Sequence, residues 1–182
     1  MREVRNALIE MRCLKESHGV CVTFDEIRIM SREHIAKLVL DHEESDNVLK
    51  HLTPYCARNN LDTNEMLYMY IKDKCKASSS SACHDGPLDT NTERKLVACI
   101  YQTTRKVDSA LLLFQRSRPP YSKRVRKLMD DAIEWAKRGA NETLIEELNE
   151  QKRLMRIDTV LVKYCTWCSF VKLFTKVSIK GS

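Results

Sequence analysis

Apolar residues recur at intervals of three and four positions along most of the chain, which is the spacing that places side chains on one face of an α-helix. The pattern predicts a series of amphipathic helices of ordinary length. The predicted stripes are Val4, Leu8, Met11 and Leu14; Ile35, Leu38 and Val39; Met66, Leu67, Tyr70 and Ile71; Leu96, Val97, Ile100 and Tyr101; Val107, Ala110, Leu111 and Phe114; Val125, Leu128, Met129, Ala132, Ile133 and Ala136; and Leu144, Ile145, Leu148 and Met155.

Short polar residues and prolines mark where these helices begin and end. Ser31, Asp62 and Asn141 stand just before apolar stripes, where a side-chain oxygen can cap the first turn. Pro54 suits the first position of a short helix, because its missing N–H has no partner there in any case. Gly139 follows the stripe of residues 125–136, and we expect it to end that helix with a positive φ.

Consecutive amphipathic helices with short breaks indicate an all-α fold, either a helical bundle or an α-solenoid of stacked helix pairs. No strict repeat at a fixed period is visible in the sequence. Tetratricopeptide and ankyrin arrays would show one. The prediction is therefore an irregular α-solenoid with armadillo- or HEAT-like stacked helix pairs.

Two segments break the helical pattern and divide the chain. Residues 77–91 contain four consecutive serines and Gly86-Pro87, which predicts a flexible loop between helical segments at 1–76 and 92–164. Residues 165–182 form an atypical tail. From about residue 164 the chain is rich in Val, Phe, Thr and Trp and alternates loosely, which is more typical of a strand than of a helix. We expect this tail to pack poorly.

Composition narrows the function classes. The chain has 182 residues but only four glycines, none near another, so neither standard Gly-rich phosphate loop is present. Of the net charge of +6, +4 lies in residues 156–182, which leaves the rest nearly balanced. The eight cysteines follow no apolar leader, which favours reduced thiols in the cytosol or nucleus. No apolar run is long enough to span a bilayer.

The candidate chemistry is sparse, and nothing in the sequence supports an enzyme or a cofactor. Cys165 and Cys168 form a CxxC without the second ligand pair that zinc needs. Cys75, Cys83 and His84 could approach a metal only across the serine-rich loop, and the adjacent carboxylates Asp130-Asp131 diverge on a helix. One basic cluster around Pro119-Pro120 is the candidate binding surface for an acidic partner, a lipid surface or nucleic acid. Its members are Arg116, Arg118, Lys123, Arg124, Arg126 and Lys127.

Several helical segments, taken in order, resemble one family. They are RNALIEMRCLKE at 5–16, PYCARNNLD at 54–62, LYMYIKD at 67–73, PYS at 120–122 and EQKRLM at 150–155. Together they look like the middle α-solenoid of the Rod (rough deal) family, the large subunit of the Rod–Zwilch–Zeste-white-ten complex. The resemblance covers roughly residues 1–164, and the tail from residue 165 departs from it.

The resemblance implies a non-enzymatic scaffold. Members of that family help to build the corona of unattached kinetochores, recruit dynein through the adaptor Spindly and support the spindle assembly checkpoint. The implied partners are the subunits of the complex. The implied location is the kinetochore in mitosis and otherwise the cytoplasm and nucleus. The family's β-propeller is not seen in this sequence, so we expect the chain to be an excerpt of a longer solenoid with uncovered apolar ends. The alternatives are a vesicle-tethering helical module and a small basic nucleic-acid-binding protein.

Overall fold

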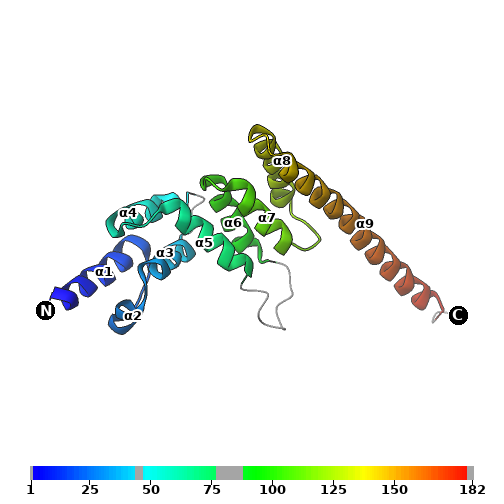
Figure 1. Cartoon of the computed structure of the whole chain (residues 1–182). Coiled ribbons are helices and arrows are strands. Elements are labelled where there is room, and N and C mark those ends of the chain that lie inside the picture. Colours follow the sequence, from blue (N-terminus) through cyan, green and yellow to red (C-terminus); the bar gives the residue numbers. More distant parts are fainter. Residues whose placement is uncertain (1, 44–46, 77–87, 180–182) are drawn as a thin grey trace.

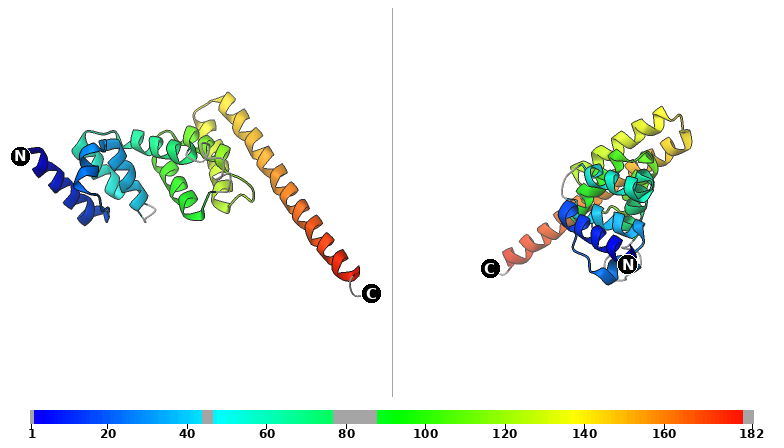
Figure 2. Two further views of the ribbon diagram at one scale, coloured as in Figure 1. Left: turned by 90° about the horizontal axis from the view of Figure 1, so that it is seen from below. Right: turned by 90° about the vertical axis from the view of Figure 1, so that its left-hand side faces the viewer.

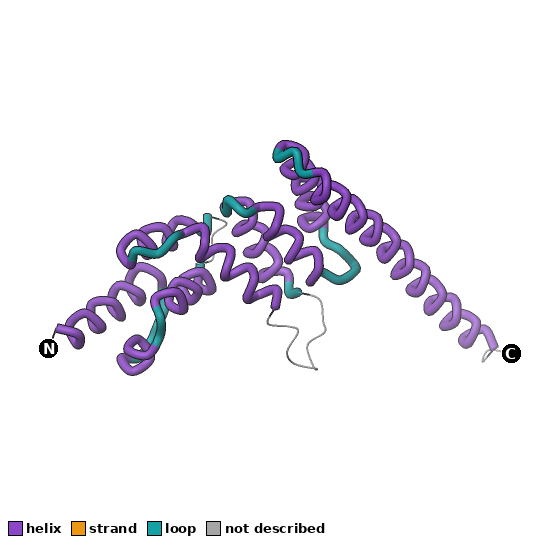
Figure 3. Tube along the Cα trace, viewed as in Figure 1, coloured by secondary structure: helices purple, strands orange, loops and turns teal. Residues whose placement is uncertain are grey.

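The computed structural model describes the backbone of residues 2–43, 47–76 and 88–179, and the side chains of residues 4–16, 19–43, 47–76 and 88–166. Within these ranges the chain consists of helices joined by short connections, with no strand (Figure 3). In chain order the helices are α1 (Arg2–His18), α2 (Phe24–Ile29), α3 (Arg32–His42), α4 (Leu49–Asn59), α5 (Thr63–Lys76), α6 (Thr90–Gln102), α7 (Lys106–Arg116), α8 (Lys123–Arg138) and α9 (Glu142–Ile179).

The helices stack in the order of the chain. The main contacts of each helix are with helices one or two places away: α3 packs on α4 and α5, α5 on α6 and α7, and α8 on α6, α7 and α9. The result is an elongated arc from α1 to α8, from which α9 projects as one long helix (Figure 1 and Figure 2). Contacts limited to sequence neighbours are the defining property of a solenoid. The predicted all-α helical-repeat fold is confirmed.

The apolar stripes predicted beyond residue 30 supply the core. Helix α8 is the clearest case, because all six of its predicted inward residues are at most 6% exposed. Leu67, Ile71, Leu96 and Ile100 are completely buried where α5 meets α6. Burying one such side chain contributes about 1.5–3 kcal/mol. These stripes therefore hold successive helices together.

Three of the predicted caps are present. Ser31, Asp62 and Asn141 each accept a hydrogen bond from the backbone amide three residues further on, at 3.2, 2.8 and 3.1 Å. Each bond satisfies an amide that has no partner within its own helix. The helices therefore begin where the sequence predicted.

The predicted start at Pro54 is wrong, because α4 begins at Leu49 and Pro54 lies inside it. Val48 and Leu52 are 1% and 0% exposed, and burying them favours a helix that starts before the proline. The carbonyl of Lys50 loses its usual amide partner to the proline ring, but Lys50 is exposed to solvent. Tertiary burial has here outweighed a local signal.

The predicted positive φ falls one residue later than expected. Gly139 has a φ of −80°, whereas Ala140 has a φ of 49°. An L-residue with a Cβ pays about 1–2 kcal/mol in that left-handed region. The residue with the positive φ is therefore Ala140, and the glycine, which would adopt that φ without strain, is its neighbour Gly139.

Exchanging the two residues, Gly139→Ala with Ala140→Gly, is expected to raise the free energy of unfolding by about 1–2 kcal/mol. A Cβ at position 139 would meet only the carbonyl oxygens of Ala136 and Trp135, at 3.5 and 3.6 Å, which are ordinary contacts. Urea denaturation followed by circular dichroism measures the change. A loss of stability in the single Ala140→Gly variant would contradict this explanation.

The two atypical segments have different outcomes. Of the predicted loop at 77–91, residues 77–87 lie outside the described residues, and the end of the prediction is wrong because α6 begins at Thr90, capped by Asp89. The prediction that the tail resembles a strand is wrong as well, since helix α9 runs unbroken to Ile179. No glycine or proline interrupts residues 142–179. Extending a formed helix is easy compared with starting one, and this outweighs the weak β-propensity of the tail.

None of the described helices combines the length and the apolar content that a membrane span requires.

Candidate functional site

The six residues of the basic cluster follow the chain from the end of α7 to the first turns of α8. Arg116 is half-buried, whereas the other five are exposed. Arg118 folds back on its own turn, where its guanidinium donates to the carbonyls of Gln115 and Ser117 at 3.1 and 3.3 Å. The six residues are therefore close in sequence but differ in their exposure to solvent and in their hydrogen-bond partners.

The basic residues of α8 spread across the exposed side of the helix. Val125 points into the core, and its neighbours Arg124 and Arg126 lie on opposite flanks of the helix, because residues two positions apart do not share a face. Arg126 lines a groove between α8 and α9. Lys123 and Lys127 lie between these flanks, because residues three or four positions apart are neighbours on a helix, so the basic residues of α8 share its solvent-facing side.

The groove between α8 and α9 has a volume of about 350 Å³. Met129 and Met155 form an apolar floor, and both are almost fully buried. Basic side chains come from both helices. The lining residues are Tyr121, Arg126, Met129, Asp130, Lys152, Met155, Arg156, Thr159 and Val160.

Two polar contacts hold the groove in shape. The Nζ atom of Lys152 lies 2.6 Å from an Oδ1 atom of Asp130, which joins α9 to α8. The Tyr121 hydroxyl donates to Asp158 at 2.9 Å and ties the connector before α8 to α9. Sequence reasoning found Arg126 but missed Lys152 and Arg156, since the helix pairing that brings them together cannot be seen in a charge run.

Burial, followed by the hydrogen bond to a carboxylate, raises the pKa of Tyr121 and of Tyr101 to about 12. The acceptor is Asp158 for Tyr121 and Asp131 for Tyr101. An ordinary tyrosine has a pKa of about 10, so the unfolded chain releases these protons first as pH rises. The stability that the neutral hydroxyls confer is therefore complete below pH ~10 and is lost as pH rises through about 12.

The double variant Tyr101→Phe/Tyr121→Phe is expected to flatten the fall of the melting temperature between about pH 10 and 12. Thermal unfolding at a series of pH values measures this slope. An unchanged slope in the variant would show that these two hydroxyls do not carry the alkaline loss of stability.

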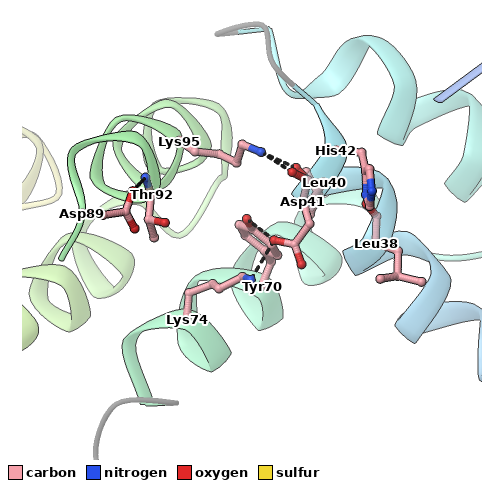
Figure 4. A network of polar contacts seen from close by, with 9 residues as sticks. All are labelled: Leu38, Leu40, Asp41, His42, Tyr70, Lys74, Asp89, Thr92 and Lys95. Atoms are coloured by element: carbon pink, nitrogen blue, oxygen red, sulfur yellow. Dashed lines mark hydrogen bonds and ion pairs between the residues drawn. The ribbon is translucent and has the colours of Figure 1, made fainter. Parts of the chain in front are cut away.

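A second polar cluster lies at the end of α3 (Figure 4). Lys95 of α6 donates through its Nζ to the backbone carbonyls of Leu40 and Asp41, at 3.0 and 2.6 Å. The last carbonyls of a helix have no partner within it and form the negative end of its dipole. Burial lowers the pKa of Lys95, while nearby Asp41 opposes that effect.

The same cluster extends to α5. The Asp41 carboxylate accepts a hydrogen bond from the Tyr70 hydroxyl at 2.9 Å and lies 2.7 Å from the Nζ atom of Lys74 (Figure 4). Burial, followed by the negative charge of Asp41, raises the pKa of Tyr70 above its usual value. These contacts join α3 to α5 and α6. We interpret the cluster as a polar clamp between stacked helices.

The cysteines are divided between the core and the surface. Cys56 and Cys99 are fully buried and pack as small apolar side chains. Burial raises the pKa of Cys99 to about 12 and that of Cys75 to about 11, which keeps both thiols neutral. Of the CxxC motif, Cys165 is exposed on α9, whereas the Cys168 side chain lies outside the described residues. Cys83 and His84 of the loop candidate also lie outside them.

The remaining candidates do not converge. Asp130 contacts Lys152 of α9, while Asp131 accepts from the Tyr101 hydroxyl, so the two adjacent carboxylates diverge as predicted. No group of three metal-ligating side chains occurs in the part of the chain that the structure describes.

No protein-family model matches the chain, and no curated protein matches it either. The groove between α8 and α9 is the pocket that a residue of the predicted basic cluster lines, and what it binds must be inferred from its shape and charge.

Proposed function

We propose that the chain is a non-enzymatic scaffold segment of the kinetochore, acting in the Rod–Zwilch–Zeste-white-ten complex. In this role it supports the spindle assembly checkpoint and, through Spindly, the recruitment of dynein. The ordered series of Rod-like segments supports the assignment to this complex. The solenoid with uncovered apolar faces supports the more general role in protein binding.

The long helix α9 carries the observation on which the scaffold role rests. In the part of α9 whose side chains the structure describes, up to residue 166, a group of large apolar residues is between 40% and 64% exposed. They are Leu154, Ile157, Val160, Leu161 and Tyr164. Leu154, Ile157, Leu161 and Tyr164 are spaced by three, four and three positions, which is the spacing of a helix-packing seam. We call all five residues, Val160 included, the outer face of α9.

The outer face lies opposite the side that already packs. Leu148 and Met155 are buried toward α8, and Ile157 lies about 180° around the helix from Leu148. A helix that is apolar on both sides is normally covered on both. Stacking a further helix on the outer face would continue the solenoid by the same contacts that build it.

The other end of the arc has a similar surface. Val4, Leu8 and Ile9 of α1 are between 48% and 57% exposed, so two residues of the first predicted stripe, Val4 and Leu8, are uncovered, whereas Leu14 of the same stripe is buried. Scattered apolar residues on a surface are normal, but contiguous groups mark binding surfaces. Exposed apolar faces on α1 and on α9 are consistent with a scaffold segment that other helical proteins contact at both ends of the arc.

Affinity capture from mitotic cells tests this proposal. Tagged chain should recover Zwilch or the Zeste-white-ten subunit. An Ile157→Glu/Leu161→Glu variant should recover much less, because two carboxylates interrupt the outer face. Ile29 is an isolated exposed residue on α2, and Ile29→Glu is the matched control that should leave recovery unchanged. Recovery of vesicle-tethering proteins without either subunit would replace the kinetochore role with one in membrane traffic.

A further inference from the structure

The groove between α8 and α9 combines an apolar floor with positive charge on both walls. Met129 and Met155 lie at its base, and Val160, which is 64% exposed, lies at its edge. Methionine is flexible and polarizable, and it is common at surfaces that accept apolar side chains of a partner. The volume of about 350 Å³ is in the range of ligand pockets, about 300–1,000 Å³.

Two arginines line this groove without a carboxylate partner, and the Nε atom of Arg126 donates to the Ser122 carbonyl of its own helix at 3.4 Å. Arg126 lines the groove from α8 and Arg156 from α9. Asp130 is paired with Lys152, and Asp158 accepts from Tyr121. Among the described residues neither guanidinium forms an ion pair. Arginine is well suited to bind carboxylates, because its planar fork can donate two parallel hydrogen bonds.

We propose that this groove binds an acidic amphipathic helix of a partner protein. An apolar side chain of that helix rests on Met129 and Met155, and its carboxylates contact Arg126 and Arg156. Charge complementarity selects the acidic partner. Val160 belongs both to the groove and to the outer face of α9, so a bound helix can continue from one surface onto the other. This inference rests on the proposed scaffold role and names the partner chemistry of one surface.

The lining of the groove favours a protein partner over nucleic acid. Single-stranded nucleic acid is usually held by several aromatic side chains along a basic track. Here the one aromatic residue is Tyr121, whose hydroxyl is bound to Asp158. An apolar floor between separated arginines matches a helix that carries apolar residues at i, i+3 and i+7 and acidic residues on both flanks of that face.

Fluorescence anisotropy with designed peptides tests the proposal on the full chain. The probe is a labelled 16-residue helix with leucine at positions i, i+3 and i+7 and glutamate on both flanks. Two matched peptides carry glutamine or lysine in place of every glutamate. The acidic peptide should bind at least about tenfold more tightly than the lysine peptide, and its affinity should fall as salt increases. Equal binding of the acidic and lysine peptides would overturn the proposal.

Variants locate the binding in the groove. Arg126→Gln/Arg156→Gln should weaken the acidic peptide by at least about fivefold, and Val160→Ser, at an exposed position, should weaken it by about threefold. Arg5→Gln/Arg138→Gln removes the same charge from exposed residues outside the groove and should change affinity by less than about twofold. An equal loss in this control would show a bulk-charge effect and overturn the assignment.

A single-stranded oligothymidine provides the competing outcome. Tight binding of this probe, lost in Arg126→Gln/Arg156→Gln, together with no binding of the acidic peptide, would assign the groove to nucleic acid and overturn the proposal. This experiment is independent of the capture from mitotic cells. A negative peptide result beside recovery of Zwilch would remove the groove proposal alone, whereas peptide binding without that recovery would remove the kinetochore assignment alone.

Discussion

The Leu113→Ala variant is expected to lose about 3–5 kcal/mol of unfolding free energy. Leu113 is 0% exposed on α7, and α7 packs on α5, α6 and α8. Truncation therefore removes buried contacts and leaves a cavity in the middle of the arc, where neighbouring helices can close it only in part. Because a solenoid is stabilised through its successive interfaces, a weak point at α7 should also broaden the unfolding transition.

Urea denaturation followed by far-ultraviolet circular dichroism measures this loss. Leu154→Ala is the matched control, since it is the same chemical change at a residue that is 40% exposed on α9. We expect it to cost less than about 1 kcal/mol. Equal losses at the two positions would mean that α7 does not occupy the centre of the core.

The second large effect concerns the outer face of α9. Five apolar side chains uncovered on one helix should cause the chain to self-associate when no partner is present. The Ile157→Glu/Leu161→Glu variant should weaken this association by at least about tenfold, because each glutamate would have to be buried without a partner. Its core is untouched, so its helix content should not change.

Size-exclusion chromatography with light scattering measures the association. The wild-type chain should show a concentration-dependent mass above that of one chain, and the variant should remain monomeric. Ile29→Glu removes an apolar residue that is 84% exposed but isolated, and this control should behave like the wild type. A wild-type chain that is monomeric at high concentration would contradict the role that we give to the outer face.

Much of the fold could be predicted from sequence because its contacts are local. The stripe of α8 and the caps at Ser31 and Asn141 depend on residues within one or two turns, and all were predicted correctly. Errors arose where distant burial decided the outcome. The start of α4 depends on Val48 and Leu52 reaching the core, and a proline five positions into the helix gives no sign of that.

The candidate site was less predictable. The run of basic residues at 116–127 is visible in the sequence, and its members on α8 share the exposed side of that helix, but the run does not show which other helix supplies the rest of the groove. The groove needs Arg156 and Met155, about 30 positions further along, and they reach it only because α9 folds back against α8. The strand-like composition after residue 164 also concealed the length of that helix.

The most direct test of the scaffold role is the position of the tagged chain in mitotic cells whose kinetochores are unattached. We expect fluorescence at those kinetochores for the wild-type chain and for Ile29→Glu, and its loss for Ile157→Glu/Leu161→Glu. Fluorescence on vesicles, or kinetochore fluorescence that is equal in all three proteins, would contradict a scaffold that is held through the outer face of α9.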